Sequence, residues 1–130
     1  MNPNKKTGFW IVTGAASGIG AAVVRAVQKS EAQVLALDVD QAKGLALAEE
    51  TGALYRPFDV GDLGQWQQLV DHLNSAKADL GSPTHIHLNA GIQIAPPDAP
   101  LSDYKLEAAT LERYRRMMSV NVDGVVFGLQ

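Results

Sequence analysis

Short, continuous runs of apolar residues alternate along this chain with stretches in which apolar residues recur every three or four positions. The continuous runs at residues 9–12 and 34–37 predict strands, and residues 53–58 and 85–88 are two further strand candidates. The periodic stretches between and after them are typical of helices with one buried face. Because strands without polar alternation are covered on both faces, the pattern predicts a doubly wound α/β fold, with a parallel sheet between two layers of helices.

Each periodic stretch also predicts which side of its helix is buried. The apolar positions of the first predicted helix are Ile19, Ala22, Val23, Ala26 and Val27. The second helix begins after Asp40, whose carboxylate can cap it, turns Leu45 and Ala48 inward and stops at Gly52. The apolar positions of the third helix are Leu63, Trp66, Val70 and Leu73. After a proline-rich loop, those of the last helix are Leu111, Tyr114, Met118, Val122, Val125 and Leu129.

Composition narrows the class of protein. The 130 residues are enough for one small domain, which we place over residues 1–130, and 46% of them are hydrophobic. A net charge of −3 gives no reason to expect binding to nucleic acid or to an acidic membrane. Without cysteine there is no disulfide, thiolate nucleophile or Cys-rich metal site. The polar residues 1–6 lead into no apolar signal or span, so we expect a soluble, cytoplasmic protein.

A glycine-rich turn, T-G-A-A-S-G-I-G, joins the first predicted strand to the first predicted helix and ends at Gly20. In a dinucleotide-binding turn, Gly14 would permit the tight bend, Gly18 would let the backbone approach a pyrophosphate, and Gly20 would let the helix pack closely on the strand. The free N–H groups at the helix N-terminus would face the phosphate charge. Ser17 and Ile19 belong to the same predicted cofactor site. The alternative is that the glycines only form a turn that starts the helix and binds no ligand.

Asp38 ends the second predicted strand, close to the spacing of roughly 20 residues at which dinucleotide-binding folds place an acidic residue. Its carboxylate would accept hydrogen bonds from the hydroxyl groups of the adenosine ribose. The same carboxylate would repel the 2′-phosphate of NADP. No Arg or Lys lies in the glycine turn or directly after Asp38, and Lys43, the nearest base, belongs on the solvent face of its helix. The predicted cofactor is therefore NAD.

The spacing T-G-x-x-x-G-I-G, and three further motifs, resemble the short-chain dehydrogenase/reductase family over residues 7–130. The matching positions follow the third strand, follow the fourth strand, and lie in the last helix: Asp59, Val60, Asn89, Ala90, Gly91 and Asn121. In the family the first pair contacts adenine, and the N-N-A-G motif lines the ribose on the nicotinamide side and supports the glycine turn. The helix asparagine belongs to the catalytic tetrad. The resemblance implies a partial Rossmann-type sheet of four strands in the order 3-2-1-4.

The resemblance implies an oxidoreductase that transfers a hydride between NAD and an alcohol or ketone. This sequence departs from the family pattern at Leu88, which replaces the first asparagine of N-N-A-G. The preceding strand also carries His85 and His87. We interpret these histidines as tolerated strand residues and not as a metal pair, because no cysteine or carboxylate cluster accompanies them.

The family performs its chemistry with a Ser and a Y-x-x-x-K pair, which lie further along the chain than residue 130. None of the tyrosines, Tyr55, Tyr104 and Tyr114, has a lysine four residues later. We therefore expect the cofactor-binding portion of a short-chain dehydrogenase, truncated before these motifs and inactive alone, with Asn121 as the one tetrad member present. The alternative is a non-catalytic module, derived from the family, that binds NAD or only self-associates.

NAD(H) is the expected small-molecule partner, and we expect no metal, nucleic acid or membrane partner. We also expect a homo-oligomer. No strand follows the fourth one to pair with it, and an open strand edge invites another chain. The last helix adds apolar side chains that in relatives face the sheet and a neighbouring subunit: Met117, Met118, Val122, Val125, Val126 and Phe127. Gly124 and Gly128 would permit close helix approach, or serve only in packing within the subunit.

Overall fold

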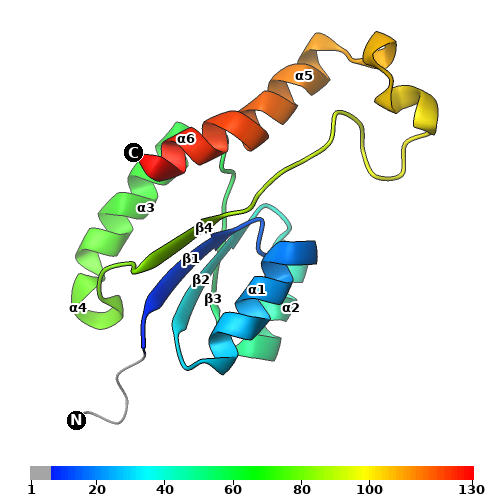
Figure 1. Cartoon of the computed structure of the whole chain (residues 1–130). Coiled ribbons are helices and arrows are strands. Elements are labelled where there is room, and N and C mark those ends of the chain that lie inside the picture. Colours follow the sequence, from blue (N-terminus) through cyan, green and yellow to red (C-terminus); the bar gives the residue numbers. More distant parts are fainter. Residues whose placement is uncertain (1–6) are drawn as a thin grey trace.

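The computed structural model describes residues 7–130, apart from the side chains at 77 and 78 (Figure 1). The polar residues 1–6, which we assigned to the domain, lie outside this range. Four strands form one sheet: β1 (Phe9–Thr13), β2 (Gln33–Asp38), β3 (Leu54–Pro57) and β4 (His85–Leu88). All pairs are parallel, and the spatial order is β3-β2-β1-β4, which confirms the predicted order.

Helices follow the strands in the predicted alternation. They are α1 (Gly18–Lys29), α2 (Gln41–Thr51), α3 (Leu63–Ser75), α4 (Lys77–Leu80), α5 (Leu111–Met118) and α6 (Gly124–Leu129). Two 3₁₀ turns, η1 (Leu101–Tyr104) and η2 (Leu106–Ala108), precede α5, and a π-helical segment, η3 (Ser119–Asp123), joins α5 to α6. The region of η1, η2 and the start of α5 extends away from the sheet (Figure 1). No helix within residues 7–130 is both long and apolar enough to cross a membrane.

The sheet separates two hydrophobic clusters. Between the sheet and helices α1 and α2 lie Val12, Ala15, Ala21, Val24, Val27, Ala32, Val34, Ala36, Leu47 and Ala53. Between the sheet and helices α3 and α6 lie Phe9, Ile11, Leu35, Leu37, Phe58, Val60, Trp66, Leu69 and Val120. The strands are apolar on both sides because each side is covered by helices, as the continuous apolar runs predicted.

The predicted buried face of the first helix was only partly correct, because Val27 is buried and Val23 packs against the core while the other three predicted positions are exposed. Ile19 is 72% exposed, Ala22 and Ala26 are exposed, and the buried positions are Gly20, Ala21, Val24 and Val27. The reason is the close contact at Gly20, where a Cβ atom would lie 2.0 Å from the carbonyl oxygen of Gly14. Only glycine can face the turn there, and this contact fixes the rotation of the helix.

In the second helix, too, the buried face differs from the predicted one. Its ends were predicted correctly: the Asp40 carboxylate accepts the Lys43 N–H, and Gly52 ends the helix with a left-handed backbone (φ +76°). Leu45, however, is 54% exposed, while Leu47 and Gly44 are buried. A Cβ on Gly44 would lie 2.1 Å from the ring of Tyr55, so the glycine again marks the side of closest approach.

In the later helices the predicted faces were also only partly correct. Trp66 and Leu69 are the buried residues of α3, and Val70 is exposed. The predicted last helix is not one regular helix, because η3 interrupts it. Its buried residues are Val120 and Gly124, whereas Leu111, Tyr114, Val122 and Leu129 are exposed.

Candidate functional site

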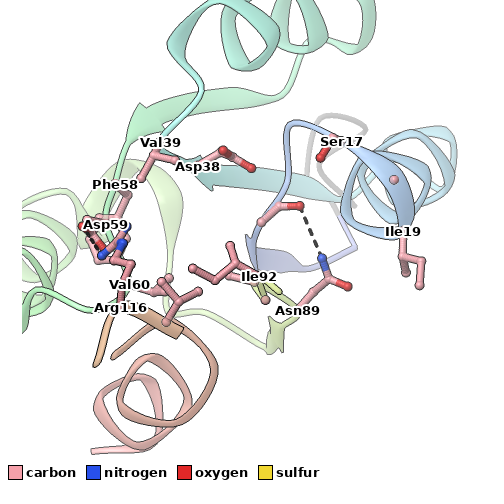
Figure 2. A pocket seen from close by; sticks show the side chains of 15 residues that line it. Ser17, Ile19, Asp38, Val39, Phe58, Asp59, Val60, Asn89, Ile92 and Arg116 are labelled. Atoms are coloured by element: carbon pink, nitrogen blue, oxygen red, sulfur yellow. Dashed lines mark hydrogen bonds and ion pairs between the residues drawn. The ribbon is translucent and has the colours of Figure 1, made fainter. Parts of the chain in front are cut away.

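A cavity of about 370 Å³ opens at the carboxyl ends of the strands (Figure 2). Residues that follow each of the four strands line it, and so does α5. This edge of a doubly wound sheet is where ligands usually bind. The structure brings to this cavity every residue that we predicted to bind the cofactor, except Gly20, whose place is beneath the turn.

The glycine turn has a different packing environment at each glycine. Gly14 has φ +62°, and a Cβ there would lie 2.7 Å from the Cα of Ala90, so the turn and the end of β4 are in backbone contact. Gly18 has φ +52°, and no heavy atom lies within 4 Å of the position that its Cβ would occupy. Ser17 precedes the first residue of α1 and makes no capping hydrogen bond through its side chain. The N-terminus of α1 therefore faces an open space that a phosphate group can enter.

The Thr13 hydroxyl, buried at the end of β1, joins the glycine turn to the segment after β4. Its oxygen accepts the backbone N–H groups of Asn89 (3.0 Å) and Ala90 (3.1 Å). The Asn89 amide donates to the carbonyl oxygen of Gly14 at 3.3 Å (Figure 2). Thr13 was not among the predicted site residues, although a polar residue at the end of an otherwise apolar run is a usable signal.

Asp38 is half-buried at the end of β2, and both of its carboxylate oxygens are held by backbone donors. Oδ2 accepts the N–H of Ala16 at 2.9 Å, and Oδ1 accepts the N–H of Asp40 at 2.9 Å. The Tyr55 hydroxyl donates to the Asp38 carbonyl oxygen at 2.9 Å. Burial, together with the charges of Asp38 and Asp40, raises the pKa of Tyr55, so this phenol remains a hydrogen-bond donor at neutral pH.

Asp59 follows β3 and lines the same cavity as Asp38, and Arg116 of α5 pairs with it (Figure 2). The Nη1 atom of Arg116 is 2.9 Å from Asp59 Oδ2 and 3.2 Å from Oδ1. Oδ1 also accepts the N–H of Gly61 at 2.9 Å. Val60, the next residue, is buried, and its carbonyl oxygen accepts the indole N–H of Trp66 at 2.8 Å. Arg116 was missed from the sequence, since nothing in the spacing indicates that this side of α5 faces the cavity.

Asn121, the predicted tetrad residue, lies in the π-helical segment and does not itself line the cavity. Its side chain pairs with the backbone of Ile92 in both directions. Oδ1 accepts the Ile92 N–H at 2.8 Å, and Nδ2 donates to the Ile92 carbonyl oxygen at 2.8 Å. Ile92 lines the cavity just after Gly91, so Asn121 acts on the site by fixing the loop after β4. Ile92 is another site residue that sequence reasoning did not find.

Side chains suited to acid–base chemistry are scarce around this cavity. Tyr55 donates to Asp38, Tyr104 donates to the carbonyl oxygen of Pro96, and Tyr114 is exposed; none of them lines the cavity. In the part of the chain that the structure describes, no three His, Cys, Asp or Glu residues come together as metal ligands. The arrangement can hold an extended ligand with phosphate and ribose groups, and the ionisable side chains among the described residues that line it are those of Asp38, Asp59 and Arg116.

The two histidines of β4 lie on the sheet side that faces α1. His85 stacks on Trp10 with 4.2 Å between ring centroids, and its Nδ1 atom is 3.0 Å from the Thr84 hydroxyl. His87 lies beside Val12 in the register of the sheet. The stacking gives the His85 ring a packing role, the Nε2 atom of His87 is buried without a hydrogen-bond partner among the described residues, and neither histidine lines the cavity.

Residues 9–130 match the family model described as short chain dehydrogenase. The chain is 36% identical over 115 residues to the L-fucose dehydrogenase of Mus musculus, covering 88% of this chain and 38% of that protein. It is 30% identical over 122 residues to the 3-beta-hydroxysteroid dehydrogenase of Comamonas testosteroni, covering 92% and 44%. The chain thus spans about two-fifths of the length of the curated relatives it matches.

A solved structure, that of the 3-ketoacyl-(acyl-carrier-protein) reductase from Brucella melitensis complexed with NADH, has the same fold with a TM-score of 0.78 and 27% identity. The similarity covers 94% of this chain and 47% of that one. Because the family model extends from the first strand to residue 130 and the strand order agrees with it, the chain belongs to the short-chain dehydrogenase family.

Proposed function

We propose that this chain is the cofactor-binding portion of an NAD-dependent oxidoreductase, which transfers a hydride between NAD and an alcohol or ketone. One observation carries the proposal. The residues that follow all four strands meet around a single cavity, and the glycine turn leaves empty space there at the N-terminus of α1. That combination suits a dinucleotide, whose pyrophosphate needs close backbone approach and whose two riboses extend along the sheet edge in opposite directions.

Each part of the cavity has residues suited to one part of the cofactor. Gly18 and Ile19 offer backbone N–H groups to the pyrophosphate at the start of α1. Asp38 is suited to accept from the hydroxyls of the adenosine ribose, and Asp59 with Val60 would form the adenine side. The segment 89–91 would lie along the ribose on the nicotinamide side. When bound, the cofactor would supply or accept the hydride.

The choice of NAD over NADP rests on the surroundings of Asp38. Its carboxylate faces the cavity, and no Lys or Arg lies near it in the glycine turn. Lys43 is engaged elsewhere, at 3.2 Å from Asp40. The family alone does not decide the question, because a relative with 30% identity is described as the NADP-dependent (R)-specific alcohol dehydrogenase of Lentilactobacillus kefiri. Here the carboxylate favours the cofactor without a 2′-phosphate.

Calorimetric titration of the 130-residue chain with NAD tests the proposal. The informative variant is Gly18→Asn, because asparagine tolerates the left-handed backbone at this position and its side chain would fill the space left for the pyrophosphate. Gly81→Asn is the matched control: Gly81 also has a positive φ (+77°) and open space around it, but it lies outside the cavity.

The proposal expects saturable binding of one NAD, lost in Gly18→Asn and kept in Gly81→Asn. Circular dichroism should show the same secondary structure in all three proteins. An unmodified chain that is folded and does not bind NAD at millimolar concentration contradicts the proposal. Equal NAD binding by Gly18→Asn would show that NAD binds elsewhere.

A further inference from the structure

The C-terminal helical region lies directly on the segment 59–61, which forms one wall of the cavity. Besides the ion pair between Arg116 and Asp59, two contacts leave no room for further atoms. A Cβ on Gly61 would lie 2.1 Å from the hydroxyl oxygen of Ser119, and a Cβ on Gly124 would lie 2.6 Å from a methyl group of Val60. The backbone of this wall is therefore fixed by η3 and α6. Its one charged side chain, that of Asp59, is held by the ion pair with Arg116.

The hydrogen bonds of the Asp59 carboxylate show what Arg116 does. Oδ1 accepts from Gly61 and from Arg116, whereas Arg116 is the only donor to Oδ2 among residues 7–130. Because a carboxylate oxygen accepts about two hydrogen bonds, Oδ2 has one acceptor position left. The side chain of Asp59 is 30% exposed and lines the cavity, so that position is open to a ligand. A carboxylate bonded only to Gly61 would be held through one oxygen and would turn more freely.

The charge of Arg116 also matters for the ligand proposed above. Asp38 and Asp59 both line the cavity, and both would repel the negative pyrophosphate of a dinucleotide. The guanidinium group of Arg116, at 2.9 Å from Asp59, offsets one of these charges. It does so without removing the acceptor position on Oδ2.

We propose that Arg116 is a positioning residue: it holds Asp59 so that this carboxylate accepts a hydrogen bond from the exocyclic amino group of adenine. The inference rests on the proposed function and deepens it, since it assigns selection for the base of the cofactor to an ion pair between α5 and the end of β3. A base with a carbonyl oxygen in place of the amino group would place one hydrogen-bond acceptor against another, the Asp59 carboxylate, and a cofactor with that base would bind less tightly.

The probe is therefore a pair of cofactors that differ in this group, NAD and nicotinamide hypoxanthine dinucleotide. Both are titrated calorimetrically into the 130-residue chain. The unmodified chain should bind NAD roughly tenfold more tightly, as expected for one hydrogen bond to a charged group. In Arg116→Gln the preference should fall to roughly threefold or less. Arg116→Lys keeps the charge and should keep part of the preference, and Asp59→Ala should abolish it.

Arg115→Gln is the matched control, because Arg115 is the preceding residue of the same helix, is exposed and does not line the cavity. It removes the same charge from α5 and should leave the preference unchanged. Arg116→Gln in combination with Asp59→Ala should lose no more of the preference than Asp59→Ala alone, since both act on one hydrogen bond. Circular dichroism and thermal unfolding identify a variant that is not folded, and Arg116→Lys then provides the folded comparison.

The outcomes separate this inference from the proposed function. If the unmodified chain binds no NAD, both are wrong. If the unmodified chain binds NAD but has the same affinity for both cofactors, the inference is wrong and the proposed function stands. The same holds if Arg116→Gln lowers the affinity for both cofactors equally, so that the ratio of the two affinities is unchanged. A merely structural Arg116 would give the second of these results, because a loosened wall affects both cofactors alike.

Discussion

The replacement of Asp38 by alanine tests the proposed choice of cofactor most directly. The Asp38 carboxylate is half-buried, lines the cavity, and is held in place by the backbone N–H groups of Ala16 and Asp40. It is therefore oriented before any ligand arrives. Asp38→Ala removes both the charge and the acceptor oxygens of this side chain. It should therefore lower the affinity for NAD and raise the affinity for NADP relative to that for NAD.

The magnitude follows from two contributions. A 2′-phosphate with nearly two charges, about 5 Å from the carboxylate in a medium between water and protein surface, would be repelled by about 2–3 kcal/mol, or roughly 30- to 140-fold. Loss of a hydrogen bond from the ribose to a charged acceptor weakens NAD by about 1.5 kcal/mol, or roughly tenfold. The unmodified chain should thus prefer NAD by about two orders of magnitude or more, and Asp38→Ala should prefer it by less than roughly tenfold.

Calorimetric titrations with NAD and NADP at two salt concentrations measure both contributions, because added salt weakens only the repulsion. Asp40→Ala is the matched control. Asp40 also ends in a carboxylate, but it caps α2 by accepting the Lys43 N–H at 3.0 Å and does not line the cavity. Asp40→Ala should lower the free energy of unfolding, because the helix cap is lost, and leave the preference for NAD over NADP unchanged. Equal affinities for NAD and NADP in the unmodified chain would refute the reasoning.

Three further results are expected. The 130-residue chain should form no NADH from a panel of alcohols, since no tyrosine lines its cavity, and steady NADH formation at enzymatic rates would disprove this. Gly44→Ala should lower the free energy of unfolding in urea by at least about 1 kcal/mol: the clash of its methyl group with Tyr55 outweighs the roughly 1 kcal/mol that alanine gains in a helix. Light scattering at micromolar concentration should show self-association through the open edge of β4 or the exposed Val126 and Leu129; a folded monomer would contradict it.

The strands could be predicted because a buried parallel strand has a simple signature, whereas their order was predicted from the resemblance to the family. Residues 9–12 and 34–37 are apolar without interruption, and the structure covers both from two sides. The predicted cofactor-binding residues also come together, since each follows a strand and the carboxyl ends of parallel strands meet at one edge. Site residues that directly follow strands can therefore be predicted from the sequence without knowing which helix faces are buried.

The buried faces of the helices were harder to predict because the prediction used the spacing of the apolar side chains and left out glycine. Gly20, Gly44 and Gly124 each mark the closest approach of a helix to its neighbour, where a side chain would clash. Large apolar residues on another side, such as Ile19 and Leu45, determined the predicted face and are exposed. A helical glycine flanked by good helix formers is thus better evidence for the buried side than a bulky residue is, because a helix interior otherwise disfavours it.

The π-helical segment explains why the last helix defeated the periodic pattern. The Gly124 N–H donates to the Ser119 carbonyl oxygen, five residues earlier, as in a π-helix. In a regular α-helix, residues five apart would point about 140° from each other. Here both residues face the segment 59–61, and Asn121, between them, reaches Ile92. A pattern with a period of 3.6 cannot place these contacts together, so the helix wall of the site becomes visible only in the structure.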